Sequence, residues 1–161
     1  MNQPEVFMLC GLTGSGKSTY AEELVAQGYE KLSLDETMNE KHGRAGIDYP
    51  AEDYTMLEDA IKPELQEKLV GFLAVGKSVV LDYGFWKKQN RDFHKQLIGK
   101  NGGIWRLVYF KASPATLKER LRIRNARTDA NAVHVTEAML DDFMQRFEEP
   151  NNEGEEVIKI I

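Results

Sequence analysis

A glycine-rich segment near the amino terminus constrains this chain more than any other feature. It comprises residues 11–18, Gly-Leu-Thr-Gly-Ser-Gly-Lys-Ser. A continuous apolar run over residues 6–10 precedes it, which is typical of a strand buried on both faces, and apolar positions at helical spacing follow it. Glycine adopts the dihedral angles that let a backbone curl with its N–H groups pointing inward. The segment therefore predicts an anion-cradling loop between a buried strand and a helix.

The segment matches the pattern G-x-x-x-x-G-K-[ST] of the phosphate-binding P-loop at every fixed position. In such a loop Lys17 places its charge on the β and γ phosphates, and the Ser18 hydroxyl is a hard oxygen ligand for Mg²⁺. We therefore expect a nucleoside triphosphate and Mg²⁺ to bind here. The motif alone does not separate a kinase from an ATPase, a GTPase or a motor. The residues that it assigns to the nucleotide are Gly11, Leu12, Thr13, Gly14, Ser15, Gly16, Lys17 and Ser18.

Strand-like and helix-like segments alternate along the chain, which indicates an α/β fold. We expect strands at 6–10, 29–34, 78–83, 104–110 and 157–161. We expect helices at 17–28, 57–76, 87–100, 113–124 and 136–147. This alternation predicts a P-loop NTPase with a five-stranded parallel sheet and helices on both faces. We expect one domain over 1–161, with an irregular or partly helical, substrate-facing region at 36–53 and an acidic, solvated link at 148–156.

Two aspartates follow apolar strands whose carboxyl ends should meet the P-loop. Ligands of open parallel sheets bind at that edge. Asp82 follows Val79-Val80-Leu81 and is a candidate Mg²⁺ ligand; the alternative is a cap for the next turn. Asp35 follows Leu32-Ser33-Leu34 and is a candidate general base toward an acceptor hydroxyl. A second Mg²⁺ ligand or a helix N-cap are the alternatives for Asp35.

Three arginines occur at spacings of four and three, namely Arg120, Arg124 and Arg127. On one helix they would share a face, and their repulsion would favour an anion beside them. Arginines on a flap stabilise the charge that develops on a transferred phosphoryl group. We therefore expect a lid at about 120–135. The alternative is a solvated basic helix face.

Composition limits the partners and the location of the protein. With 161 residues and a formal net charge of −5, the chain should repel an extended nucleic acid, although a single strand end stays possible. The longest stretch without a charged residue, 6–16, is too short to cross a bilayer, so no membrane association is expected. The amino terminus lacks a basic secretory region, and the single Cys10 suits a reducing compartment. A cytoplasmic location follows.

The chain resembles the bacterial predicted kinases of the small AAA-type ATP-binding group. The residues that carry the resemblance are the P-loop, the turn at 33–35, the segment 80–86 (Val-Leu-Asp-Tyr-Gly-Phe-Trp), the stretch 120–127 and the segment 146–148. That group is similar to the kinase domains of polynucleotide kinases, to chloramphenicol phosphotransferase and to zeta toxins. The resemblance implies a nucleoside-monophosphate-kinase type of fold and covers nearly the whole chain.

Applied to this sequence, the resemblance implies ATP at Gly14 to Thr19, Asp35 as the catalytic base, and a lid carrying Arg120, Arg124 and Arg127. One position departs from the group. Many relatives have an arginine three residues after the base, where this chain has Met38. Arg44, in a segment that also holds Asp48, is a candidate to replace that contact.

These observations predict an ATP- and Mg²⁺-dependent kinase whose acceptor is a hydroxyl of a small molecule or of a nucleic-acid end. Lys17, Asp35 and the three arginines are its predicted catalytic residues, and Ser18 and Asp82 its metal ligands. A nucleotide-dependent switch or ATPase module that acts on a protein partner is the alternative from another class. A polynucleotide 5′-end kinase is a third possibility, which would require a positive channel.

Overall fold

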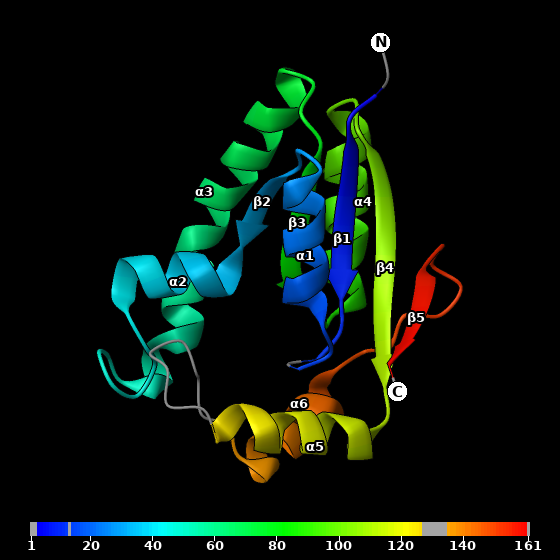
Figure 1. Ribbon diagram of the computed structural model, residues 1–161. Coiled ribbons are helices and arrows are strands. Elements are labelled where there is room, and N and C mark those ends of the chain that lie inside the picture. Colours follow the sequence, from blue (N-terminus) through cyan, green and yellow to red (C-terminus); the bar gives the residue numbers. More distant parts are fainter. Residues whose placement is uncertain (1–2, 13, 127–134, 161) are drawn as a thin grey trace.

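The computed structural model describes residues 3–12, 14–126 and 135–160. A five-stranded sheet in the order β2-β3-β1-β4-β5 forms its centre, and every neighbouring pair of strands is parallel (Figure 1). This confirms the predicted fold class. The strands are β1 (Glu5–Cys10), β2 (Glu30–Ser33), β3 (Val79–Gly84), β4 (Ile104–Ala112) and β5 (Glu156–Ile160).

The strand before the glycine-rich loop lies in the middle of the sheet. β1 pairs with β3 on one side and with β4 on the other, so both of its edges are hydrogen bonded. Its side chains alternate between two apolar layers: Met8 packs toward one face and Phe7 toward the other, and both are buried. A strand buried on both faces carries a continuous apolar run, which is why residues 6–10 showed no alternation.

Helices cover both faces of the sheet, as the sequence predicts. Helices α2, α3 and α4 pack on one face of the sheet, where Leu65 of α3 and Ile98 of α4 are buried. Helix α1 packs on the other face, where Leu24 is buried. Pro63 lies inside α3, and the helix continues through it. The helices are α1 (Lys17–Ala26), α2 (Leu34–His42), α3 (Tyr54–Ala74), α4 (Lys88–Lys100), α5 (Pro114–Asn125) and α6 (Glu137–Arg146).

Helices α5 and α6 lie across the carboxyl ends of β1 and β4, next to the glycine-rich loop (Figure 1). Their buried residues, including Leu117 and Leu140, form a small apolar cluster with Leu12 of that loop. Ser113 caps α5, since its Oγ accepts a hydrogen bond from the backbone N–H of Thr116 at 3.1 Å, and Pro114 occupies the first turn. The apolar cluster therefore fixes α5 beside the loop.

The region 36–53 is largely ordered into short elements. The predicted second strand ends at Ser33, one residue earlier than expected, and α2 begins at once. A 3₁₀ turn at Ala51–Asp53 then leads into α3. Ser33 explains the early start, because its Oγ accepts from the backbone N–H of Glu36 at 3.2 Å and caps α2. Asp35 thus lies in the first helical turn, and the proposed N-cap role for Asp35 is wrong.

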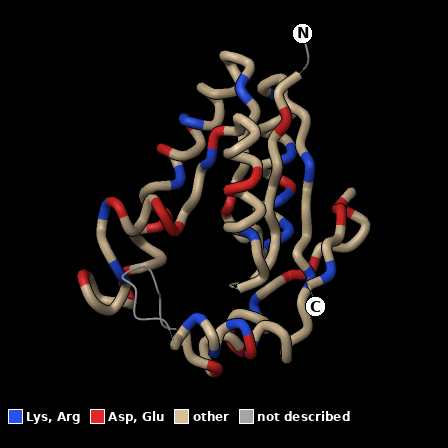
Figure 2. Tube along the Cα trace, viewed as in Figure 1, with Lys and Arg blue, Asp and Glu red and all other residues tan. Residues whose placement is uncertain are grey.

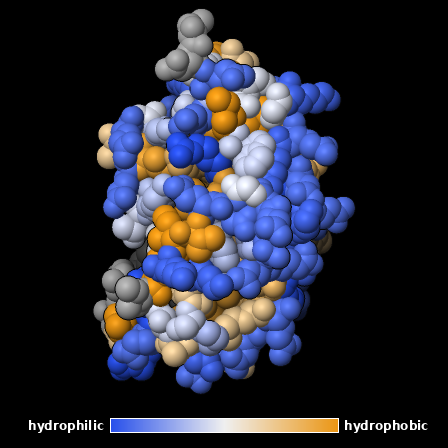
Figure 3. All heavy atoms as spheres, turned by 90° about the vertical axis from the view of Figure 1, so that its right-hand side faces the viewer, coloured by the Kyte–Doolittle hydropathy of each residue, from blue (hydrophilic) through white to orange (hydrophobic). Residues whose placement is uncertain are grey.

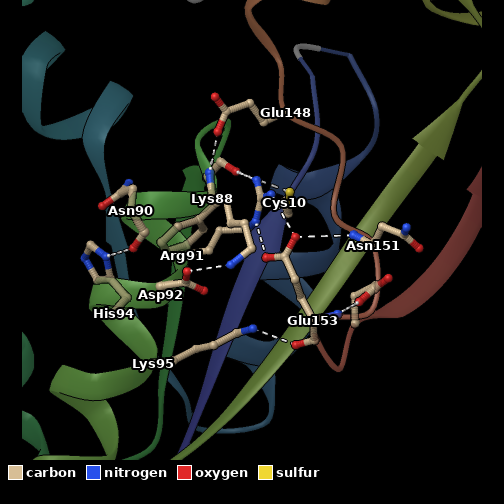
Figure 4. A network of polar contacts seen from close by, with 12 residues as sticks. Cys10, Lys88, Asn90, Arg91, Asp92, His94, Lys95, Glu148, Asn151 and Glu153 are labelled. Atoms are coloured by element: carbon tan, nitrogen blue, oxygen red, sulfur yellow. Dashed lines mark hydrogen bonds and ion pairs between the residues drawn. The ribbon is translucent and has the colours of Figure 1, made fainter.

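The acidic link at 148–156 is only partly solvated, contrary to the prediction. The side chain of Glu153 is only 5% exposed and binds the guanidinium of Arg91 through both oxygens, at 2.8 and 3.0 Å (Figure 4). Arg91, on α4, is fully buried and also donates to the Phe85 carbonyl oxygen at 2.7 Å. Lys95 donates to the Glu153 carbonyl oxygen at 2.6 Å. An ion pair between residues 62 apart therefore anchors the link to α4.

Viewed from the β5 edge, the surface is dominated by hydrophilic side chains, with small separate hydrophobic patches between them (Figure 3). None of the helices in the described part of the chain is long and apolar enough to cross a membrane.

Candidate active site

The glycine-rich loop leaves β1 and opens directly into α1, as predicted. Gly14 and Gly16 have positive φ angles of 85° and 98°, a region that residues with a Cβ rarely adopt. Gly16 is the N-cap of α1 and provides no side-chain cap. The loop therefore ends on the backbone N–H groups of a helix N-terminus, where an anion is favoured.

Lys17, the first residue of α1, folds back over the loop. Its Nζ donates to the carbonyl oxygens of Gly11 and Leu12, both at 3.0 Å. Burial lowers the pKa of the Lys17 ammonium, while the charges of Asp82 and Asp35 act in the opposite direction. The ammonium thus lies in the loop with two carboxylates close enough to affect it.

A buried hydroxyl of the loop lacks a partner in the described structure. Ser15 is 1% exposed, and its Oγ has no hydrogen-bond partner among the residues described. An unpaired buried polar atom costs about 1–3 kcal/mol, so such atoms are uncommon outside binding loops. This orphaned hydroxyl fits a loop built to contact a phosphate group.

Ser18 and Asp82 lie together at the carboxyl end of the sheet. Ser18 Oγ donates to Asp82 Oδ2 at 3.0 Å. Burial raises the pKa of Asp82, opposed by the charge of Lys17 and the Ser18 hydrogen bond, while Asp35 raises it further. Asp82 lies inside β3, opposite Ser33 of β2, rather than at a turn. The strand position favours the metal-ligand assignment over the turn cap.

The oxygens of Ser18 and Asp82 suit Mg²⁺ better than a metal that needs three or more protein ligands. Among the described residues no group of three or more His, Cys, Asp or Glu side chains is arranged to hold a metal. Mg²⁺ usually takes one or two protein oxygens and completes its shell with water and substrate phosphates. Ser18 and Asp82 fit that donor set.

Asp35 faces the same end of the sheet from α2. Its carboxylate is exposed, and its Oδ1 accepts a hydrogen bond from the hydroxyl of Tyr54 at 3.1 Å. The register pairs Ser33 with Asp82, so the first turn of α2 starts beside the Asp82 carboxylate. The structure thus brings Lys17, Asp82 and Asp35 into one electrostatic neighbourhood.

Two of the three predicted arginines lie on the loop side of α5. Arg120 Nη1 donates to the Gly14 carbonyl oxygen at 3.3 Å. The charge of Arg124 acts on Lys17 and lowers its pKa. Arg122, by contrast, pairs with Glu119 at 2.7 Å on the exposed side of the helix. Arg127 and Thr13 lie outside the described residues.

The segment after β3 contacts the loop in a way that the sequence did not predict. The backbone N–H of Gly11 donates to the Gly84 carbonyl oxygen at 3.0 Å, and Trp86 Nε1 donates to the Gly11 carbonyl oxygen at 3.3 Å. Phe85, between them, has a φ of 50°, which is uncommon for a residue with a Cβ. These contacts satisfy the N–H and the carbonyl oxygen of Gly11. They join residues far apart in the sequence, so no local sequence pattern predicts them.

Arg44, the candidate to replace the arginine missing at Met38, contacts Asp48. Its backbone N–H donates to Asp48 Oδ2 at 2.7 Å, and its Nε lies 3.8 Å from the same oxygen. Met38 is buried in the apolar layer of α2 and α3. Arg44 and Asp48 therefore stabilise their own turn.

Residues 6–150 match a family of AAA domains, which is nine-tenths of the chain. The chain belongs to this AAA domain family. The match extends from the first residues of β1 to the start of the link before β5. It therefore includes every predicted catalytic and nucleotide-binding residue.

Solved structures share the fold of this AAA domain at low sequence identity. A provisionally assigned kinase from Chloroflexus aurantiacus j-10-fl has a TM-score of 0.74 at 19% identity, with 99% of this chain and 86% of that chain covered. A gluconokinase from Sinorhizobium meliloti 1021 gives 0.65 at 22%, covering 99% and 84%. A chain of the Pnkp1/Rnl/Hen1 RNA repair complex gives 0.71 at 16%, covering 91% and 44%. The fold of this AAA domain is therefore the P-loop kinase-like fold.

Among curated proteins, a UPF0200 protein of Thermococcus gammatolerans (strain DSM 15229 / JCM 11827 / EJ3) is 32% identical over 76 residues. The matched segment is 47% of this AAA domain and 40% of that protein. The match thus spans less than half of either chain.

Proposed function

We propose that this AAA domain is an ATP- and Mg²⁺-dependent kinase that transfers the γ-phosphoryl group to a hydroxyl of a small molecule. The observation that carries the proposal is the position of Asp35. Its carboxylate lies outside the loop, in the first turn of α2, and this helix starts next to Ser33, which pairs in register with Asp82. A kinase needs such a carboxylate, close to the γ phosphate but reached from the acceptor side.

The residues of the loop supply the nucleotide side of the reaction. The backbone of 11–19 would bind the phosphates, and the Lys17 ammonium would place its charge on the β and γ groups. Ser18 and Asp82 would hold Mg²⁺, which would supply positive charge to neutralise the phosphate oxygens. Arg120 and Arg124 stabilise the charge that spreads over the transferred group, and Arg127 shares that role.

Asp35 accepts the proton of the acceptor hydroxyl. Its first-turn position on α2 leaves the carboxylate exposed, and the Tyr54 hydroxyl fixes one oxygen. The region 36–53, together with the start of α3, lines the acceptor side. A cytoplasmic location is part of the proposal.

The charge distribution supports a small acceptor rather than an extended nucleic acid. The formal net charge is −5. Acidic and basic positions alternate over most elements of the trace, with basic positions on α5 near the loop (Figure 2). A protein that tracks a polynucleotide backbone uses a groove of positive charge instead.

A screen of nucleosides, sugars, antibiotics and oligonucleotides with ATP and Mg²⁺ identifies the acceptor, and Asp35→Asn then tests the mechanism. The variant should bind ATP as the wild type does and lose roughly 10²- to 10⁴-fold in transfer rate, the usual contribution of a general base. Asp92→Asn, which removes a surface carboxylate of α4 paired with Lys88, is the matched control and should keep the rate. An undiminished rate in Asp35→Asn refutes the base assignment.

A further inference from the structure

The hydroxyl of Tyr54 lies against the carboxylate of Asp35 on the acceptor side of the proposed active site. Tyr54 is the first residue of α3, and its hydroxyl donates to Asp35 Oδ1 at 3.1 Å. Glu58 follows one helical turn later on the same face of α3. Besides burial, the charge of Glu58 raises the pKa of the Tyr54 hydroxyl, as does the charge of Asp35. Nothing in the sequence pattern links these residues to Asp35.

A phenol has one proton to donate, so it satisfies one carboxylate at a time. Burial, and then the charges of Asp35 and Glu58, raise the pKa of Tyr54 far above its usual range, so the phenol stays protonated. Burial also raises the pKa of Glu58, against the Tyr54 hydrogen bond and the Lys62 charge, and Asp35 raises it further. The charges of Asp35 and Glu58 therefore both favour a protonated Tyr54 phenol, which can donate to Asp35.

Other charged groups face this set from three elements. Lys17 of α1 and Asp82 of β3 interact with Asp35. Lys62 lies 3.8 Å from Glu58 on α3 and 3.0 Å from Asp59. Burial and the charges of Asp35 and Glu58 raise the pKa of the Tyr49 hydroxyl, so this hydroxyl remains protonated. The charges of these neighbouring groups therefore contribute to any pH dependence of Asp35, Tyr54 and Glu58.

We propose that Tyr54 is a positioning residue for the base Asp35. Its hydroxyl holds Oδ1 and leaves Oδ2 to the acceptor hydroxyl. The inference rests on the proposed kinase function. In the step that it serves, the acceptor O–H bond breaks, its proton passes to Asp35, and the acceptor oxygen bonds to the γ phosphorus. The bond from the γ phosphorus to the bridging oxygen breaks, and ADP leaves with that electron pair.

The pH dependence of kcat separates this role from a structural one. Tyr54→Phe should lower kcat roughly 10- to 100-fold, the loss of a hydrogen bond to a charged group, and should move the acid limb of the profile to higher pH. Glu58→Gln should move the same limb to lower pH, because a nearby negative charge is removed. The KM for ATP should stay unchanged in both. Loss of rate without these opposite shifts, or a changed KM for ATP, overturns the proposal.

Two matched controls accompany these variants. Tyr29→Phe removes another phenol that donates to a carboxylate, Glu5 Oε2 at 3.0 Å, on the opposite face of the sheet. Glu64→Gln neutralises a surface carboxylate of the same helix, α3, that pairs with Lys41. Both should retain the wild-type acid limb. A limb that moves equally in the controls overturns the proposal.

A second measurement does not depend on catalysis. Carbon-13 NMR follows the titration of the Glu58 carboxyl in the full-length protein with ADP bound. Asp35→Asn should lower the pKa of Glu58, since the Asp35 charge raises it, and Tyr54→Phe should raise it, since the Tyr54 hydrogen bond lowers it. A Glu58 titration that ignores both substitutions overturns the inference. A wild-type protein that phosphorylates no acceptor overturns the proposed function instead, and this is visible before any variant is made.

Discussion

At the residue scale, the side chains of the ion pair Arg91–Glu153 are almost fully buried, with exposures of 1% and 5%. Glu153→Gln leaves the fully buried Arg91 guanidinium without its charged partner, and breaking such a pair costs about 3–5 kcal/mol. Urea unfolding at neutral pH measures the loss. Asp92→Asn, which breaks an exposed pair with Lys88 on the same helix, should cost under about 1 kcal/mol. Equal losses in the two variants would contradict the buried role of Glu153.

The same pair predicts the direction of a pH effect. The hydrogen bond from Arg91 holds the pKa of Glu153 below its usual value. A carboxylate whose pKa is depressed by folding stabilises the protein above its unfolded pKa, about 4.3, and loses that stabilisation as pH falls through the folded value. The difference in unfolding free energy between wild type and Glu153→Gln should therefore shrink as pH falls below about 4. A difference that is constant with pH would show that the pair is not ionised in the folded protein.

At the element scale, the cap of α2 places the proposed base. Ser33→Ala removes the acceptor for the Glu36 N–H and should cost about 1 kcal/mol of stability. It should also lower kcat, because Asp35 lies in the turn that the cap fixes. Thr136→Ala removes the equivalent cap of α6, where Thr136 Oγ1 accepts from the Met139 N–H at 3.1 Å, and should cost as much stability with no loss of kcat. If the two variants had the same kcat, the cap of α2 would have no role in catalysis and the prediction would be wrong.

Elements with a strong local signal were predictable from the sequence. The P-loop, the five strands and the cap at Ser113 depend on neighbouring residues, and each is found within a few residues of its predicted place. The early start of α2 was missed because Ser33 has the sequence features of both a strand residue and a cap. The contacts of Tyr54 with Asp35 and of Arg91 with Glu153 were missed because they join residues 19 and 62 apart, which no local periodicity encodes.

At the scale of the whole molecule, nucleotide binding should stabilise the fold by mass action. At a ligand concentration about 100 times Kd, the gain is about 2.7 kcal/mol, which thermal unfolding detects as a higher Tm. Lys17→Ala should abolish most of the shift produced by ADP with Mg²⁺, because the ammonium lies against the loop carbonyl oxygens. Lys118→Ala, a surface lysine of α5 that faces Asp141, should keep the shift. A full shift in the Lys17 variant would contradict the binding assignment.

The fold of the molecule and its chemistry depend on different features. The sheet order and the family match establish the P-loop kinase-like fold. The chemistry depends on a few side chains at one edge of that sheet, and the same fold also supports ATPases and switches. The fate of the γ-phosphoryl group distinguishes these classes.

The most direct test follows that group with γ-labelled ATP and Mg²⁺ in the presence of the acceptor panel. A kinase moves the label onto an acceptor hydroxyl, and the transfer falls by roughly 10²-fold or more in Asp35→Asn while ATP binding persists. Label that leaves only as inorganic phosphate, at the same rate in wild type and Asp35→Asn, would contradict the account and assign the molecule to the ATPases or switches.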